Sequence, residues 1–417
     1  MVHHTMNTRM SSAASASNSK SHMGSNRQTR ASAAARWAVA AILGTLAACG
    51  TVPPESPPPP AAAPPAAAAA PGAVIEQPRS RWVPVGWDAL PGWGADQLVM
   101  AWPALLRSCQ RPGPAWVALC AEARGLKDPT ETAVRAWLQQ RLQPYRVEAK
   151  DAPAGTPADV GLVTGYFEPL VEASRLPRGA FRVPLHAPPA DLQQRRPYWT
   201  RAQLEMLPAA KEALKGREIA YVADPLDALL LQVQGSGRLW VTEPDGSRRL
   251  VRVAFAGHND HPYRSVGRWL VDQGAFTLDQ ASWPAIKAWA RANPQRVQEM
   301  LHANPRVVFF REEPLSDPTV GPVGAQGVAL TPGRSIAVDK ESVPYGTPVW
   351  IDTTEPQPWG SPQPPRPLQR LVLAQDTGAA IVGAVRADYF WGWAEGAEDR
   401  AGRMKQPLRM WVLWPRR

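Results

Sequence analysis

Residues 370–392 read RLVLAQDTGAAIVGAVRADYFWG and combine two apolar runs with two aspartates. The first run ends in Asp376, and Asp388 follows the second run and the turn at Gly383. Carboxylates at strand ends and beside glycine-rich loops are expected either to lie in a functional site or only to cap loops. The aromatic residues that follow Asp388 can raise the pKa of its carboxyl group towards that of a usable general acid.

Short apolar runs separated by turn residues continue this pattern through the C-terminal part of the chain. A third aspartate, Asp339, ends one of them. Many short strands of this kind predict a small β-barrel. The strands that we expect are residues 306–310, 334–339, 348–352, 370–376, 379–385 and 409–414.

The central part of the chain has a mixed pattern of helices and strands. Residues 161–169 are expected to form a strand, and 239–243 and 249–255 a hairpin that turns at 244–246. Ser265 and Ser282 are expected N-caps. The helices that we expect cover about 201–215, 225–234, 266–273, 284–292 and 295–303.

Length and charge restrict the class of protein. The 417 residues allow roughly two domains once the ends are discounted. The net charge of +10 includes five basic residues, and no acidic ones, within the first 50 positions. The rest of the chain is therefore only mildly basic, which suits an acidic polymer such as a cell wall. No basic cluster with interleaved aromatic residues points to a nucleic-acid partner.

The N-terminal part resembles an export signal. Residues 38–48 form an apolar run after several arginines and end at Cys49, and the run is too short to span a membrane. The ending resembles a bacterial lipobox, which implies a lipidated Cys49 after a signal region of residues 1–49; the alternative is a buried helix with an incidental cysteine. Gly50 stands where an aspartate would resemble an inner-membrane retention signal, so it favours an outer-membrane location. The proline- and alanine-rich linker covers residues 50–78, and its stretch 51–71 could reach roughly 60 Å.

Two further cysteines lie in a segment, residues 101–142, that is expected to be helical. Cys109 and Cys120 flank the Pro112-Gly113-Pro114 turn. An exported chain meets an oxidising compartment, so we expect a disulfide between them. The alternative is a pair of buried thiols.

Several long motifs, in order along the chain, resemble the MltA family of lytic transglycosylases. The C-terminal part is similar to the "3D" module, whose three aspartates match Asp339, Asp376 and Asp388. The resemblance runs from about Trp82 to the C-terminus, with Ala379 standing where the family usually has a second glycine. The matching stretches are residues 164–169, 231–237, 257–268, 330–339, 343–350, 375–378 and 383–392.

The resemblance implies a mainly β fold with an α+β insertion. A double-psi β-barrel domain would be built from residues 79–171 and 305–417, with the 3D module at about 320–415. A second domain, residues 172–304, would be inserted between the two parts. The glycan would lie in the groove where the domains meet.

The resemblance also implies a lytic exotransglycosylase, a carbon–oxygen lyase that cleaves the β-1,4 bond between MurNAc and GlcNAc of peptidoglycan and leaves a 1,6-anhydroMurNAc end. Asp388 would act first as general acid and then as base, with Asp376 and Asp339 in support. Two alternatives stay open: a hydrolase that uses a second carboxylate, and a non-catalytic peptidoglycan-binding lipoprotein. The expected substrate-binding residues are Tyr166, Glu168, Gln234, Ser236, Tyr263 and Arg268.

No cofactor or metal is expected, because His258, Asp260 and His261 lack a convincing third or fourth protein ligand of zinc nearby. The expected partners are peptidoglycan glycan strands, the membrane through the lipid anchor, and proteins of cell-wall synthesis. The expected location is the periplasmic side of the outer membrane.

Overall fold

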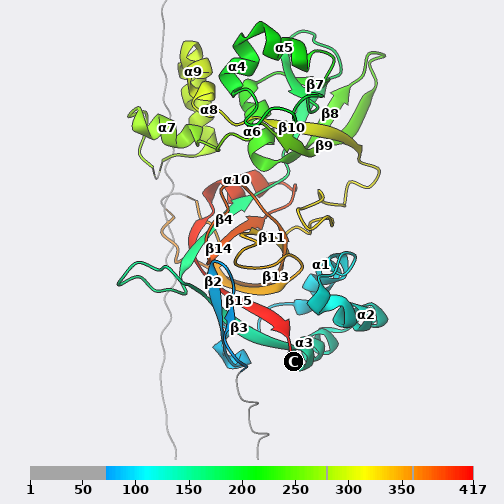
Figure 1. Cartoon of the computed structure of the whole chain (residues 1–417), viewed down its shortest axis with the longest axis vertical. Helices are drawn as coiled ribbons and strands as arrows, with labels where there is room; N and C mark the ends of the chain where they lie inside the picture. Colours follow the sequence, from blue (N-terminus) through cyan, green and yellow to red (C-terminus); the bar gives the residue numbers. More distant parts are fainter. Residues whose placement is uncertain (1–71, 279, 359–360, 417) are drawn as a thin grey trace, which may run out of the picture. The chain divides into compact units, whose positions relative to one another are not determined.

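The computed structural model describes residues 72–278, 280–358 and 361–416 of the chain (Figure 1). The expected signal segment, Cys49 and most of the linker lie outside the described residues. Within the described ranges, no helix is long and apolar enough to cross a membrane. The strands named in these ranges belong to two sheets, one of nine strands and one of six.

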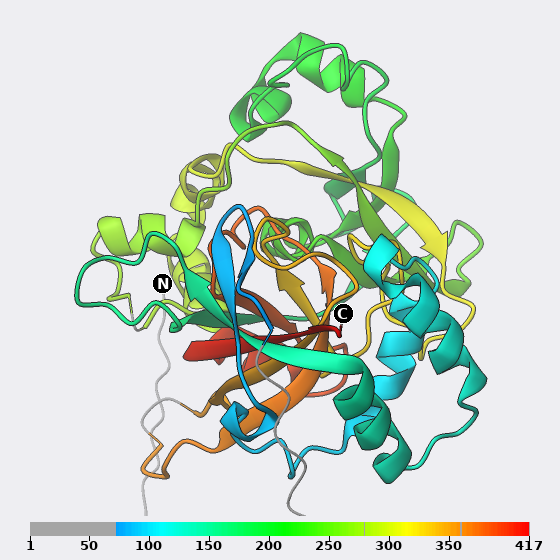
Figure 2. The same cartoon turned by 60° about the horizontal axis from the view of Figure 1, so that its bottom comes forward.

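Six strands of the larger sheet close into a barrel. Strand β15 pairs with β4 along its first part and with β12 further on, so the order β4-β14-β11-β13-β12-β15 returns to β4. Figure 2 shows the C-terminal strands of this barrel in orange and red. The sheet contains β1 (Ile75–Glu76), β2 (Ser80–Pro84), β3 (Leu142–Ala149), β4 (Gly161–Tyr166), β11 (Ser335–Val338), β12 (Pro348–Thr354), β13 (Pro367–Asp376), β14 (Arg386–Phe390) and β15 (Lys405–Pro415).

The barrel strands are covered on both faces where their sequence is continuously apolar. All four residues of β11 are buried, and residues 371–375 of β13 are buried as well. Strands that are buried on both faces read as unbroken apolar runs, which is why these segments are recognisable in the sequence. The barrel interior is filled by aliphatic side chains such as Val338, Val349 and Val412.

Three helices pack against the outside of the barrel. They are α1 (Trp102–Ser108), α2 (Val117–Gly125) and α3 (Glu131–Arg141), which share one hydrophobic cluster with Trp350 and Trp411 of the barrel. Short 3-10 turns accompany them at Trp87–Ala89, Leu98–Ala101 and Pro114–Trp116. Cys109 and Cys120 are joined by a disulfide with a Cα–Cα distance of 5.2 Å, as the sequence predicts.

A further helix, α10 (Ala397–Arg403), lies against β4. The close approach requires a glycine on the strand, because a Cβ at Gly165 would lie 2.9 Å from the Cα of Ala401. This packing places the C-terminal part of the chain directly beside β4, the strand that leads out of the barrel.

The smaller sheet has the order β10-β9-β8-β5-β7-β6. Its strands are β5 (Leu170–Ser174), β6 (Val183–His186), β7 (Glu218–Val222), β8 (Ser236–Thr242), β9 (Arg248–His258) and β10 (Val308–Pro314). The associated helices are α4 (Arg201–Met206), α5 (Pro208–Leu214), α6 (Pro225–Gln234), α7 (Val266–Asp272), α8 (Trp283–Ala292) and α9 (Val297–His302), with a 3-10 turn at Pro294–Arg296. The mainly β barrel with an α+β insertion is therefore confirmed. Ser265 and Ser282 cap α7 and α8 as predicted.

Two strand predictions need correction. Residues 306–310 were assigned to the barrel, but β10 pairs with β9 in the smaller sheet. The smaller sheet thus runs from Leu170 to Pro314 and extends past the expected insertion of residues 172–304 on both sides. Residues 379–385 form turns rather than a strand, and the strand follows them as β14.

The chain crosses from the larger sheet to the smaller sheet beside a buried carboxylate. The side chain of Glu168 is fully buried between β4 and β5, where it accepts a hydrogen bond of 2.8 Å from Nε of Arg238 and another from Arg252. The same two guanidinium groups donate to the carbonyl oxygens of Pro318 and Val320. These two residues lie on the segment that leads from β10 of the smaller sheet back to β11 of the barrel. One cluster of charges therefore connects the two segments of chain that link the sheets.

We expect Glu168→Gln to lower the free energy of unfolding by about 3–5 kcal/mol, because it leaves two buried arginines without their counter-ion. Urea denaturation followed by circular dichroism would measure the loss.

Glu172→Gln provides a matched control for this change. Glu172 lies on β5 and pairs with Arg248 at an exposed position, where an ion pair contributes less than about 1 kcal/mol. Equal destabilisation by both substitutions would show that Glu168 has no special role in holding the sheets.

Candidate active site

Asp388 lies in the middle of β14, not at the end of a strand as the sequence suggested. Strand β14 runs parallel to β4 and pairs Asp388 with Thr164. The Thr164 hydroxyl donates a hydrogen bond of 2.6 Å to Oδ1 of Asp388 and accepts one of 2.9 Å from Nη2 of Arg386. Alternate residues of β14 share a face, so Arg386 and Asp388 are both half-buried while Ala387 between them is buried.

The surroundings of Asp388 favour its neutral form. Burial raises the pKa of this carboxyl group to about 6, and the negative charge of Asp376 acts in the same direction. The hydrogen bond from Thr164 and the positive charge of Arg386 oppose the rise in pKa. The result is a carboxyl group that can give up and take back a proton near neutral pH.

Asp376 ends β13, which shares the neighbouring strand β11 with β14. Its Oδ2 accepts a hydrogen bond of 2.9 Å from the Tyr166 hydroxyl, and its Oδ1 accepts one of 3.0 Å from the amide of Ala325. Burial raises the pKa of Asp376, while these hydrogen bonds and one from the backbone of Thr377 act against the rise. Both of its oxygens are thus engaged by the protein.

Asp339 follows β11 and holds the loops around it. Its oxygens accept hydrogen bonds of 3.0 Å from the amide of Glu341 and 2.9 Å from the amide of Gly383, and Arg79 lies 3.0 Å away. The residue is buried. These contacts anchor the turn before β14, so Asp339 positions the strand that carries Asp388.

The expected substrate-binding residues differ in their placement. Tyr166 lies beside the aspartates through its bond to Asp376, and the side chain of Gln234 accepts a hydrogen bond of 3.0 Å from the amide of Phe167. Ser236 begins β8 and is half-buried. Tyr166 is thus the last residue of β4, Gln234 bonds to the residue that follows it, and Ser236 is the first residue of β8.

Two of the other expected binding residues are placed differently from the prediction. Glu168 is buried with its charge paired to two arginines, so it cannot contact a glycan directly and the prediction of a substrate-binding role is corrected. Arg268 lies on the surface of α7 and pairs with Asp272 at 2.9 Å. It does not line either of the pockets described below.

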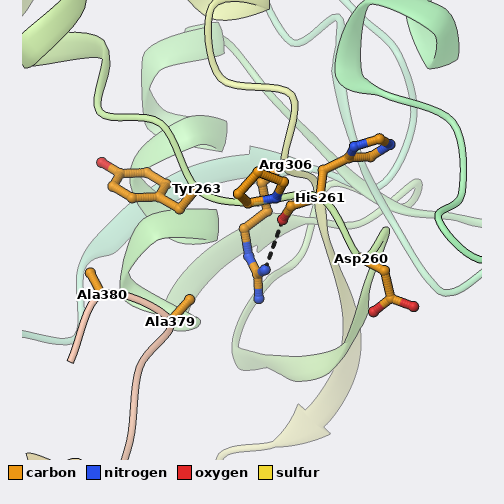
Figure 3. A pocket seen from close by; sticks show the side chains of 7 residues that line it. Asp260, His261, Tyr263, Arg306, Ala379 and Ala380 are labelled. Atoms are coloured by element: carbon orange, nitrogen blue, oxygen red, sulfur yellow. Dashed lines mark hydrogen bonds between the residues drawn. The ribbon is translucent and has the colours of Figure 1, made fainter. Parts of the chain in front are cut away.

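A pocket of about 470 Å³ is lined by residues of the insertion and of the barrel (Figure 3). It contains Tyr263 from the expected set, together with Arg306, which the sequence analysis missed. Its wall on the barrel side is the turn at Ala379 and Ala380, a few residues after Asp376. Asp376 and Asp388 do not themselves line this pocket. A second pocket of about 300 Å³ contains Phe255 and His258 of β9.

The histidines near the first pocket are engaged by the protein. Nδ1 of His258 lies 3.2 Å from the carboxylate of Asp260, and Nε2 of His261 is 2.8 Å from the carbonyl oxygen of Tyr198. Across the residues that the structure describes, no group of three or more His, Cys, Asp or Glu side chains is arranged to hold a metal ion.

Comparisons with known proteins agree with this architecture. The "MltA specific insert domain" matches residues 162–311, and the "3D domain" matches residues 334–414. A Vibrio cholerae protein named "Membrane-bound lytic murein transglycosylase A" is 30% identical over 292 residues, which are 68% of this chain and 75% of the relative. The chain belongs to the MltA family.

Solved structures of similar proteins extend the likeness over most of the chain. The lytic transglycosylase LtgG of Burkholderia pseudomallei is 45% identical, with a TM-score of 0.55 over 84% of this chain and 99% of that one. MltA of Neisseria gonorrhoeae is 29% identical, with a TM-score of 0.67 over 83% and 95% of the two chains. The MltA insert match ends at residue 311, within β10, in agreement with the placement of that strand in the smaller sheet.

The Thr164 hydroxyl favours the ionised form of Asp388, so Thr164→Val should raise the pKa of Asp388 above its value of about 6. Carbon-13 NMR titration of the aspartate carboxyl groups would measure the change, with the Asp388 resonance assigned by its loss in Asp388→Asn.

Thr319→Val is the matched control, because the Thr319 hydroxyl donates a hydrogen bond of 2.6 Å to a different carboxylate, that of Asp317. This control should leave the titration of Asp388 unchanged. A pKa of Asp388 that stays constant or falls in Thr164→Val would contradict the electrostatic role of Thr164.

Proposed function

We propose that this MltA family member is a lytic transglycosylase that cleaves the β-1,4 bond between MurNAc and GlcNAc in peptidoglycan and leaves a 1,6-anhydroMurNAc end. The observation that carries the proposal is the half-buried carboxyl group of Asp388 with its pKa raised to about 6. Family membership supports the substrate, because the Vibrio cholerae relative is named for murein.

Asp388 is proposed to perform both proton transfers. The neutral acid donates its proton to the glycosidic oxygen as the bond to C1 of MurNAc breaks, and the sugar becomes oxocarbenium-like. The resulting carboxylate is stabilised by the Thr164 hydroxyl and the charge of Arg386. It then accepts the proton of the MurNAc C6 hydroxyl, whose oxygen attacks C1 and closes the anhydro ring.

The neighbouring aspartates favour this route over hydrolysis. A hydrolase would require a second carboxylate as nucleophile or as base for a water molecule. The oxygens of Asp376 accept from Tyr166 and Ala325, and those of Asp339 bind two amides and Arg79. We therefore assign both aspartates to the support of Asp388, and the attacking hydroxyl group to the substrate, where its effective concentration is high.

The glycan is proposed to lie between the barrel and the insertion. The pocket at Tyr263 is lined by residues of both the insertion and the barrel, and its barrel wall is the turn that follows Asp376. Tyr166, Gln234 and Ser236 remain the proposed contacts at the junction of β4 with the smaller sheet.

Digestion of purified sacculi should release fragments that end in 1,6-anhydroMurNAc, about 18 mass units lighter than hydrolysed ends, because no water is added. Mass spectrometry of a digest in ¹⁸O-labelled water should find no label at the new C1. Labelled reducing ends would identify a hydrolase, and protein that sediments with the wall without releasing fragments would identify a binding protein.

The same assay tests the role of Asp388. Asp388→Asn should lower the rate by about 10²–10⁴-fold, because the amide cannot donate and recover a proton. Asp245→Asn, in the turn between β8 and β9, should leave the rate unchanged. Because the donor is the neutral acid, the rate of the unmodified protein should fall as the pH rises through about 6.

The attachment to the membrane is also a proposal. We infer that Cys49 carries a lipid and that residues 51–71 form a tether, which would let an outer-membrane enzyme reach the wall. The support is the lipobox-like ending at Cys49, the proline-rich composition after it, and the name "membrane-bound" of the relatives.

Cys49→Ser should abolish lipidation and leave either soluble protein or an uncleaved precursor. Membrane fractionation and the mass of the N-terminal peptide would measure the result. Processed protein that still fractionates with the outer membrane would show that the anchor lies elsewhere.

A further inference from the structure

The pocket between the insertion and the barrel contains a positive charge that the proposed reaction does not use. Arg306 lies just before β10 and is half-buried. Figure 3 shows its guanidinium group between Tyr263 and Ala379 on one side and Asp260 on the other. Within the residues that the structure describes, the guanidinium makes one hydrogen bond, which Nη1 donates to the carbonyl oxygen of His261 at 3.0 Å.

The charge of Arg306 has no counter-ion in the part of the chain that the structure describes, where no carboxylate lies within ion-pair distance of it. The nearest acid on the pocket wall, Asp260, is engaged elsewhere, at 3.4 Å from Arg196 and 3.2 Å from His258. Its carboxylate points away from Arg306 in Figure 3. Burial lowers the pKa of Arg306, and the charge of Asp260 offsets the effect only in part.

A neighbouring arginine shows what a structural role looks like. Arg201 is also buried without an ion pair, but its guanidinium donates to the carbonyl oxygens of Asn304 and Arg306 and to the side chain of Gln232. A guanidinium has five N–H donors, so one hydrogen bond leaves most of the capacity of Arg306 unused. Arg201 is satisfied by the protein, whereas Arg306 faces a cavity.

The rest of the pocket wall fits a small anion with an apolar stem. Tyr263 contributes its ring, with the hydroxyl directed away from Arg306 in Figure 3, and Ala379 and Ala380 contribute only methyl groups. The turn that contains these alanines begins three residues after Asp376, so a glycan strand bound at the aspartates can extend to this pocket. A planar guanidinium matches the geometry of a carboxylate.

We propose that this pocket binds a carboxylate of the peptidoglycan substrate, with Arg306 as its counter-ion. The inference rests on the proposed function, and it adds that the enzyme distinguishes carboxylate-bearing strands from neutral glycans. Two parts of the substrate carry this chemistry. One is the lactyl group of MurNAc in strands without peptides, and the other is the stem peptide in intact strands.

Binding should be measured by isothermal titration calorimetry in the Asp388→Asn background, which prevents cleavage. The three ligands are soluble strands with stem peptides, strands freed of peptides by an amidase, and chitohexaose, which has no carboxylate. Arg306→Gln should weaken binding of a carboxylate-bearing strand about tenfold or more, because a charge-assisted hydrogen bond is lost, and leave chitohexaose binding unchanged. Loss with peptide-free strands alone identifies the lactyl carboxylate, loss with peptide-bearing strands alone identifies the stem, and loss with both shows that the pocket accepts either carboxylate.

Chitohexaose also controls for the fold of the loop that Arg306 supports. Arg248→Gln is the matched control, because Arg248 is an exposed arginine of the insertion already paired with Glu172. The inference is overturned if Arg306→Gln binds all three ligands as the parent does, or weakens all three equally. The proposed function fails separately, if the unmodified protein releases no anhydro-ended fragments from sacculi.

Discussion

The buried carboxylate of Glu168 is the interaction on which both parts of the molecule depend. A carboxylate in the protein interior is tolerated only when it is paired and hydrogen-bonded, and Glu168 meets this condition through Arg238 and Arg252. The arginines also bind carbonyl oxygens of the chain that returns to the barrel, and Arg238 stacks on Trp393 at 4.0 Å. A single charge cluster thus connects the two segments of chain that link the sheets and the segment after β14.

The same short run of sequence builds the candidate site. Thr164 and Tyr166 lie two residues apart on β4, so their side chains share a face of the strand. Thr164 donates to Asp388 and Tyr166 donates to Asp376. Glu168 follows at the same spacing, where the strand leaves the barrel. Fixing Glu168 therefore also fixes the end of the strand that supplies hydrogen bonds to both carboxylates.

Local signals in the sequence were sufficient for much of the fold but not for the turn before β14. Apolar runs located β11, β12 and β13, and serine caps located α7 and α8. Residues 379–385 are equally apolar, yet they turn, because Gly383 takes a φ of 131° and its amide bonds to Asp339, 44 residues earlier. The contact of Thr164 likewise depends on a partner distant in sequence, Asp388, which no local pattern reveals.

The electrostatics of Asp388 reconcile two opposite requirements of the proposed reaction. A donor must be protonated before the bond breaks, and burial together with the charge of Asp376 favours that state. The same group must then exist as a carboxylate, which Thr164 and Arg386 stabilise. Burial alone would give a strong preference for the acid and a poor return of the proton. Because Arg386 reaches Asp388 through the Thr164 hydroxyl at 2.9 Å and 2.6 Å, the stabilising charge is present without a direct ion pair that would hold the carboxyl group ionised from the start.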